Sequence, residues 1–329
     1  MSFGKVLTFT DPFQYQSAIR AADVEVVPTT KGRFRCELTQ INLNELWIQH
    51  FDECLPRIYS ATMKPGRQVV GFLMDEHQPA MRHSGMDVSP RHIIICGEEA
   101  LRQRSEAGAR YGSMSLTTND LQAAYMSLVG REFLSPQTTY LARPNAELLS
   151  RFLELHRTVE QITRTVSELF EIPEVIRNLE QQLTHVMVRC LAEGDPQRMS
   201  SGGFNQDRIV SRFEEFLESH PDQPLYLAEI CAAISTTERT LRAACEAHFD
   251  MGPIRYLSLR RMHLVHRALL SADHRSTNVT QVATDHGFWE LGRFAVNYRA
   301  IFGEMPSATL RRPPPDKKPI ITKRRLARS

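Results

Sequence analysis

The feature that most constrains the fold is a helix pair that occurs twice between residues 208 and 312. Each copy predicts two amphipathic helices joined by a turn, because inward-facing residues recur three and four positions apart. These residues are Leu227, Ile230, Cys231, Ile234, Leu241 and Cys245 in the first copy and Val279, Val282, Ala283, His286, Phe294, Tyr298, Ile301 and Phe302 in the second. Corresponding positions lie 52 or 53 residues apart, so the sequence predicts two copies of one helix-turn-helix unit.

A single helix is expected to join the two copies. Pro253 is a helix-start signal, and the apolar residues that follow it lie on one helical face. They are Ile254, Leu257, Leu264, Ala268 and Leu269. A fixed separation suits a DNA reader, since adjacent major-groove faces recur about every 34 Å. The alternative is a plain helical bundle with accidental repetition, against which Gly287 in the second turn argues.

A strict apolar seam precedes this region. Its members are spaced alternately four and three residues apart, which is typical of coiled-coil packing. They are Leu148, Phe152, Leu155, Val159, Ile162, Val166 and Leu169. Pro173 interrupts the helix, and a second helix continues the spacing with Ile176, Leu179, Leu183, Val186 and Cys190. The two helices could pack on their own chain, but the narrow seam favours self-association as a homodimer.

The first third of the chain has the alternation of β-strands. From Arg33 to about Leu141, short apolar-polar alternating runs are separated by turn residues, which indicates a small barrel or sandwich. The predicted fold is therefore α+β and multidomain. Its parts are a β-rich domain (1–144), a helical dimerisation hairpin (145–193), a flexible linker (194–207), an all-α domain with two helix-turn-helix motifs (208–312) and a basic disordered tail (313–329).

Several segments resemble the AraC/XylS class of bacterial transcription regulators. The matching segments are Ser235–Leu241, Gly252–Leu257 with Arg260–Met262, Gly287–Phe294 and Phe302–Pro306. Phe288-Trp289 with Leu291-Gly292 is most similar to the ethanolamine-utilisation regulator branch. The resemblance implies a cupin-like or β-barrel effector domain, a dimerisation element, a two-motif DNA-binding domain, and RNA polymerase as a partner.

The residues expected to read double-stranded DNA lie on or beside the outward face of the second helix of each pair, and the resemblance places the family's base-contacting positions of the first motif at Arg239, Arg242 and Ala243. In the first motif the expected residues are Thr237, Glu238, Arg239, Thr240, Arg242 and Ala243, and in the second Trp289, Glu290, Leu291, Gly292, Arg293, Val296 and Asn297. Arginine suits bidentate contacts with guanine, whereas Leu291, Gly292 and Val296 offer no hydrogen-bond donor. We therefore expect the first motif to carry most of the base readout and the second to dock mainly on the backbone.

The charge is distributed along a gradient. Residues 1–207 carry 21 basic and 25 acidic side chains, residues 208–312 carry 13 and 12, and residues 313–329 carry 6 and 1. The tail cations are expected either to attract phosphates without sequence specificity or to serve solubility alone. They are Lys317, Lys318, Lys323, Arg324, Arg325 and Arg328. Because residues 208–312 carry almost equal numbers of basic and acidic side chains, acids such as Glu214, Glu215 and Glu218 are expected to face away from DNA.

Composition indicates a cytoplasmic, nucleoid-associated protein. Its six cysteines are widely spaced, which argues against disulfides and zinc, and no apolar run approaches the roughly 20 residues of a membrane span. No catalytic motif, cofactor loop or metal triad is evident, because His77, His83 and His92 are too scattered for a cupin metal site. His263 and His266 are expected to pack or face solvent.

The first domain is therefore expected to bind an unidentified small-molecule effector, without a cofactor. Its pocket candidates are Trp47, Tyr59, Phe72 and Tyr111. An effector-responsive activator is the favoured function. A ligand-independent architectural DNA-binding protein and an enzyme fused to a DNA-binding domain are the alternatives.

Overall fold

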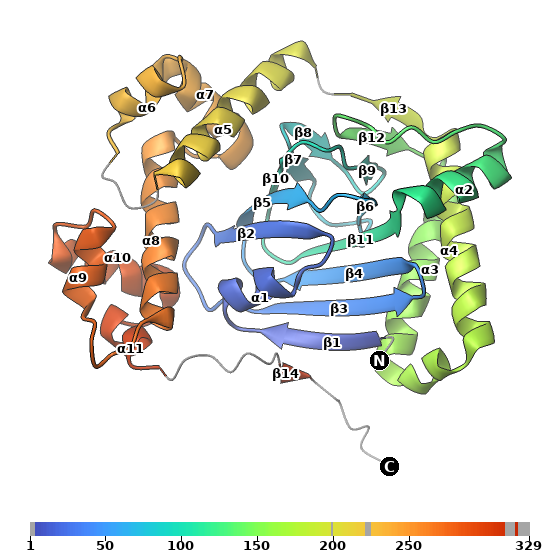
Figure 1. Cartoon of the computed structure of the whole chain (residues 1–329), viewed down its shortest axis with the longest axis horizontal. Coiled ribbons are helices and arrows are strands. Elements are labelled where there is room, and N and C mark those ends of the chain that lie inside the picture. The colour runs from blue at the N-terminus through green and yellow to red at the C-terminus, as the bar shows by residue number, and fades with distance from the viewer. Residues whose placement is uncertain (1–3, 199, 221–224, 313–319, 322–329) are drawn as a thin grey trace.

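A computed structural model describes residues 4–198, 200–220, 225–312 and 320–321. A β-rich domain lies between a helical hairpin on one side and an all-α domain on the other (Figure 1). This arrangement confirms the predicted α+β class, with β-strands first and helix-turn-helix units last.

Within the described residues, the strands form two sheets. The nine-stranded sheet has the spatial order β13 (Asp195–Gln197), β12 (Tyr140–Arg143), β9 (Ile93–Ile95), β6 (Arg67–Leu73), β11 (Ala109–Thr117), β4 (Leu46–Glu53), β3 (Cys36–Leu43), β1 (Gly4–Phe9) and β14 (Ile320–Ile321). The five-stranded sheet has the order β2 (Ala22–Pro28), β5 (Arg57–Met63), β10 (Leu101–Ser105), β7 (Met81–His83) and β8 (Met86–Val88). The β domain is thus a two-sheet, cupin-like arrangement without full closure into a barrel.

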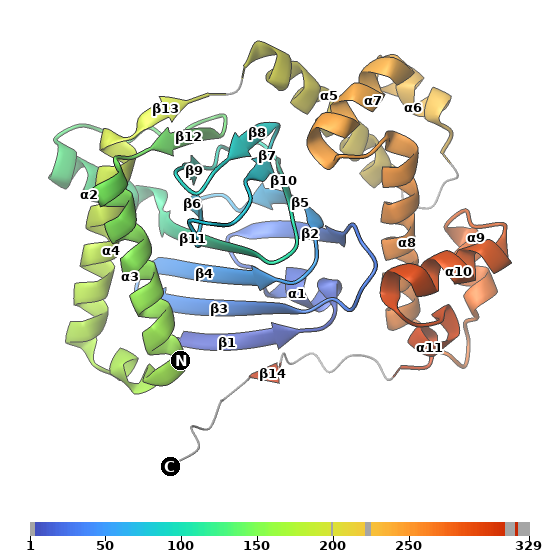
Figure 2. The ribbon, with the colours of Figure 1, turned by 180° about the vertical axis from the view of Figure 1, so that it is seen from behind.

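The nine-stranded sheet is buried on both faces. Successive side chains of a strand point to opposite faces, so Ile94 joins the core between the sheets while Ile93 and Ile95 join the core beneath the helices. The inner core also contains Tyr15 of α1 (Pro12–Ala18). The outer core is covered by α2 (Thr118–Val129), α3 (Ala146–Thr165) and α4 (Pro173–Glu193), as Figure 2 shows.

The seam predicted for dimerisation packs on its own chain. Leu148, Phe152 and Val159 are buried against the sheet, and Leu155 and Ile162 pack half-buried beside them. The hairpin itself is confirmed, with the 3₁₀ helix η1 (Ser167–Glu171) just before Pro173. Assigning the seam to a dimer interface is therefore wrong for its buried members, because the hydrophobic effect is already satisfied within one chain.

The predicted end of the seam departs from the helix. Val166 is the C-cap of α3 and is 44% exposed, while Leu169 lies in η1. The heptad spacing continued past the point where the hydrogen-bonded helix stops, so the regular pattern overestimated its length.

The predicted flexible linker is largely ordered. Asp195–Gln197 form β13, which pairs with β12, and α5 (Ser201–Ser219) begins seven residues before the expected boundary at 208. Ser200 caps this helix by accepting a hydrogen bond from the Gly203 amide at 3.2 Å. The Ser-Ser-Gly-Gly sequence that indicated a linker is thus a helix start.

The all-α domain consists of α5, α6 (Leu227–Ala233), α7 (Glu238–Phe249), α8 (Pro253–Ser271), α9 (Val279–Asp285), α10 (Leu291–Phe302) and α11 (Pro306–Leu310). Its two halves have separate cores. Tyr256 and Leu257 of α8 belong to the core with α5 to α7, whereas Val265 and Leu269 belong to the core with α9 to α11. The expectation of one apolar face on α8 is too narrow, and Ile254 is 63% exposed.

The tail cations lie outside the described residues. Ile320 and Ile321 are described, and they pair with Thr8 and Leu7 of β1, respectively. None of the helices that the structure describes has the length and apolarity needed to cross a membrane.

Candidate DNA-binding interface

The turns of the two helix pairs have the same backbone conformation. Ser235 and Gly287, 52 residues apart, both adopt positive φ, at 52° and 81°. The amide after each donates to a carbonyl five residues earlier, from Thr236 to Cys231 and from Phe288 to Ala283, both at 2.9 Å. This 6→1 bond is the Schellman helix ending, and it confirms the repeat at the level of hydrogen bonds.

All six predicted residues of the first motif are exposed on or just before α7. They are Thr237, Glu238, Arg239, Thr240, Arg242 and Ala243. Thr237 caps the helix by accepting from the Thr240 amide at 3.2 Å, while Leu241 and Cys245 face the core with 0% exposure. Among the described residues, Arg239 and Arg242 have no carboxylate within ion-pair distance, so both guanidinium groups remain available to a ligand.

The second motif presents a more apolar surface. Phe294 and Tyr298 of α10 are buried, whereas Trp289 and Val296 are 71% and 69% exposed. Glu290, Gly292, Arg293 and Asn297 are exposed and Leu291 is half-buried. Arg293 pairs with Glu290 at 3.5 Å, but exposed pairs of this kind contribute little stability and can open toward another anion.

The two recognition helices border one groove. Arg242 of α7 and Asn297 of α10 both line it, and the first half of α8 forms its floor. With 19 residues at 1.5 Å each, α8 is about 28 Å long, close to one turn of DNA. Because both halves pack on α8, the recognition helices are held at a defined separation.

Comparison with known proteins connects this geometry to a family. A helix-turn-helix domain family model matches residues 230–312. The XylDLEGF operon transcriptional activator 2 of Pseudomonas putida is 30% identical over 131 residues, which span 40% of this chain and 83% of that protein. The chain belongs to the AraC/XylS family of transcription regulators.

Two further comparisons differ in how much of the chain they cover. The probable thc operon regulatory protein of Rhodococcus erythropolis is 36% identical over 106 residues, or 32% of each protein, so the chain matches only about a third of that relative. The AraC-like transcriptional activator CuxR is 14% identical, covers 80% of this chain and 94% of its own, and has a TM-score of 0.40. Both sequence relatives named here are transcription regulators.

In this AraC/XylS chain the DNA-binding domain is joined to the β domain by a buried ionic cluster. Glu214 of α5 accepts hydrogen bonds from Arg102 of β10, from Ser60 at 3.0 Å and from Tyr256 at 2.6 Å. Asp207 lies 3.6 Å from Arg102, and burial raises its pKa to about 6. Glu214, which was expected only to face away from DNA, is 5% exposed and connects two domains.

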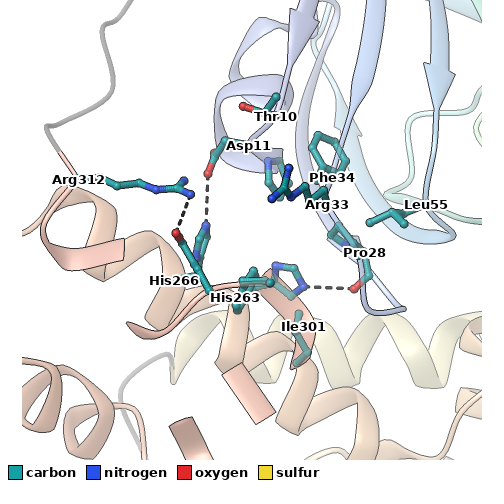
Figure 3. A pocket seen from close by; sticks show the side chains of 15 residues that line it. Thr10, Asp11, Pro28, Arg33, Phe34, Leu55, His263, His266, Ile301 and Arg312 are labelled. Carbon is teal, nitrogen blue, oxygen red and sulfur yellow. Dashed lines mark hydrogen bonds and ion pairs between the residues drawn. The ribbon is translucent and has the colours of Figure 1, made fainter. Parts of the chain in front are cut away.

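A second contact lies at the other end of α8 (Figure 3). The Nε2 of His266 is 3.3 Å from Asp11, and His263 donates through Nε2 to the Pro28 carbonyl at 3.2 Å. Burial lowers the pKa of His263 to about 4, so it stays neutral near pH 7. Both histidines therefore pack between the domains. Of the two expectations, packing or facing solvent, the first is confirmed.

The β domain has little room between its sheets. Tyr59 and Tyr111 line an interior cavity of about 20 Å³, enough for about one water, and Phe72 packs against Phe152. Trp47 also lines an outer groove of about 730 Å³. Three of the four predicted aromatics are thus core residues.

The outer groove combines apolar walls with cations. Leu7, Phe9 and Phe13 supply apolar surface, and its basic residues are Lys5, Arg20 and Lys64. Burial and the nearby Arg20 lower the pKa of Lys5. Within the described residues no group of three or more His, Cys, Asp or Glu side chains could hold a metal ion.

Proposed function

We propose that the chain is a sequence-specific transcription regulator that reads two adjacent major-groove segments with α7 and α10. The observation that carries this proposal is the exact recurrence of the turn, from Ser235 to Gly287, with an exposed recognition face after each copy. Two equivalent readers on one shared helix suit two adjacent segments of one duplex.

The division of labour between the motifs is part of the proposal. Arg239 and Arg242 give the first motif two free guanidinium groups, the donors best suited to guanine O6 and N7. Trp289 and Val296 give the second motif exposed apolar groups, which suit thymine methyls and sugars. The first motif accordingly supplies most of the sequence discrimination.

Selection from a random-sequence duplex library tests this function. The full-length chain should enrich a single site of roughly 15–25 base pairs, as two adjacent major-groove contacts require. Recovery of unrelated sequences would instead favour the architectural DNA-binding protein.

We further propose that the effector is a small organic anion bound in the groove beside Trp47. Apolar walls would bury its body, while Lys5 and Arg20 would pair with its charged group. A thermal-shift screen of organic acids should find a compound that raises the Tm of the wild type. Lys5→Ala should weaken that shift, and Arg91→Ala, an exposed arginine remote from the groove residues, should leave it unchanged.

Three further features of the regulator are also proposals: its mode of activation, its branch of the family and its oligomeric state. Activation through RNA polymerase agrees with the names of the Pseudomonas relatives, which are transcriptional activators. The ethanolamine-utilisation branch rests on Phe288-Trp289 and Leu291-Gly292 alone. A homodimer would need a surface other than the buried seam, and sedimentation of the full chain tests it directly.

A further inference from the structure

We infer that the loop between β2 and β3 is a third DNA contact, through which the effector domain itself holds the phosphate backbone between the two major-groove segments. This inference rests on the proposed function. Its central residue is Lys31, which no motif singles out because Thr-Thr-Lys-Gly reads as an ordinary solvated loop.

The loop reaches the groove between the recognition helices. Thr29, Thr30 and Lys31 line the same space of about 790 Å³ as Arg242 of α7 and Asn297 of α10. Lys31 and Arg242 are exposed. A duplex that engages α7 and α10 in successive major grooves must pass a backbone across the space between them, which is where the loop stands.

The charge of this groove suits a polyanion. Its ionisable lining residues are Lys31, Arg242 and Arg255, and the described residues that line it include no Asp or Glu. Nearly half of the charged residues in the DNA-binding segment are acidic, so a groove lined by three cations and no acid is a local exception. DNA phosphates would pair with these cations and release bound counterions.

The loop is held in place before any ligand binds. The Thr29 amide donates to the Pro56 carbonyl at 2.9 Å, and the Cys54 amide donates to the Arg35 carbonyl at 3.1 Å. His263 of α8 donates to the Pro28 carbonyl, which ties the start of the loop to the DNA-binding domain. Lys31 is therefore presented from an anchored loop, and binding costs less conformational entropy.

Gly32 allows the loop to turn at this point. Its φ is 148°, and an added Cβ would come within 3.0 Å of the Leu55 side chain.

Salt-dependent binding of the full-length chain tests the inference. Fluorescence anisotropy would be measured with a labelled duplex of scrambled sequence, about 40 base pairs or four helical turns long. Lys31→Ala should lower the slope of log K against log salt by about one and weaken binding roughly fivefold to tenfold at 0.1 M salt. The same loss is expected on the selected site, because a phosphate contact carries no base information.

Arg91→Ala is the matched control, since it removes one exposed cation from a loop of the effector domain that does not line the groove. An unchanged slope in Lys31→Ala, or tighter binding, would overturn the inference, the latter by showing that the loop obstructs DNA. Failure of the wild type to bind any duplex would overturn the proposed function as well, so the two failures are distinguishable.

Discussion

Single exposed arginines should account for much of the sequence preference. Arg239→Ala removes a guanidinium that no carboxylate of the described residues engages, so discrimination at one base pair should fall by about 1–3 kcal/mol. Competition between the selected duplex and single-base variants measures this loss. Arg293→Ala is the comparison, and it should weaken all duplexes alike. Loss of preference in Arg293→Ala with none in Arg239→Ala would reverse the assigned roles.

One half-buried histidine should make the stability of the chain sensitive to acid. His263 has a folded pKa of about 4, below its usual 6.5, so its contribution is present above pH 6.5 and is lost as the pH falls toward 4. His263→Gln can still donate to Pro28 but does not titrate. Between pH 7 and pH 5 the wild type should lose about 1–2 kcal/mol more unfolding free energy than this variant. Equal losses in urea melts at the two pH values would show that His263 does not titrate as described.

The exposure or burial of some single residues could be predicted from the sequence. Exposure of Arg239 and burial of Leu241 follow from helical periodicity, which needs only local spacing. The burial of Glu214 was not predictable in this way, because its partners Ser60 and Arg102 lie more than 100 residues away in the sequence. An acid on the polar side of a helix gives no signal that another domain will cover it.

At the scale of elements, the helical hairpin shows that a sequence pattern can predict a helix without predicting the surface on which that helix packs. Spacing predicted α3, α4 and the break at Pro173, but a seam has the same spacing whether it faces a sheet or a second chain. Sheet residues such as Ile48 and Val70 explain why the seam packs on its own chain. They make the outer face of the nine-stranded sheet apolar, so that face must be covered.

The hairpin yields a stability prediction. Phe152 has 0% exposure within one chain, so Phe152→Ala should lower the unfolding free energy by about 3–5 kcal/mol. Val166→Ala, on the same predicted seam but 44% exposed, should cost less than about 1 kcal/mol. Denaturation at several protein concentrations checks both variants. Equal losses of unfolding free energy in the two variants, which disappear when the protein is diluted, would indicate that the seam is a dimer interface.

At the scale of the whole molecule, the β domain and the DNA-binding domain share a buried boundary. Val27 and Ile58 of the β domain lie in the same core as Val210 and Phe213 of α5. Together with the ionic cluster and the His263 contact, this boundary fixes the recognition helices relative to the effector domain. A ligand that strains the boundary could therefore alter DNA binding.

Glu214→Ala should test that coupling. It leaves the buried Arg102 without its main partner, and unfolding should become easier by about 3–5 kcal/mol, with the DNA-binding domain melting separately. Glu215→Ala removes the same charge from the adjacent, exposed position and should have little effect. Calorimetry of both variants distinguishes these outcomes. A single unchanged transition in Glu214→Ala would mean that the cluster does not couple the domains.

The central claim is that α7 and α10 read one continuous duplex at a separation set by α8. Its most direct test is the affinity of the full-length chain for its selected site after about five base pairs are inserted between the two halves, which turns one half to the opposite face of the helix. We predict a loss of at least about 100-fold, with partial recovery when about ten base pairs are inserted. Affinity that is unchanged by the half-turn insertion would contradict the account.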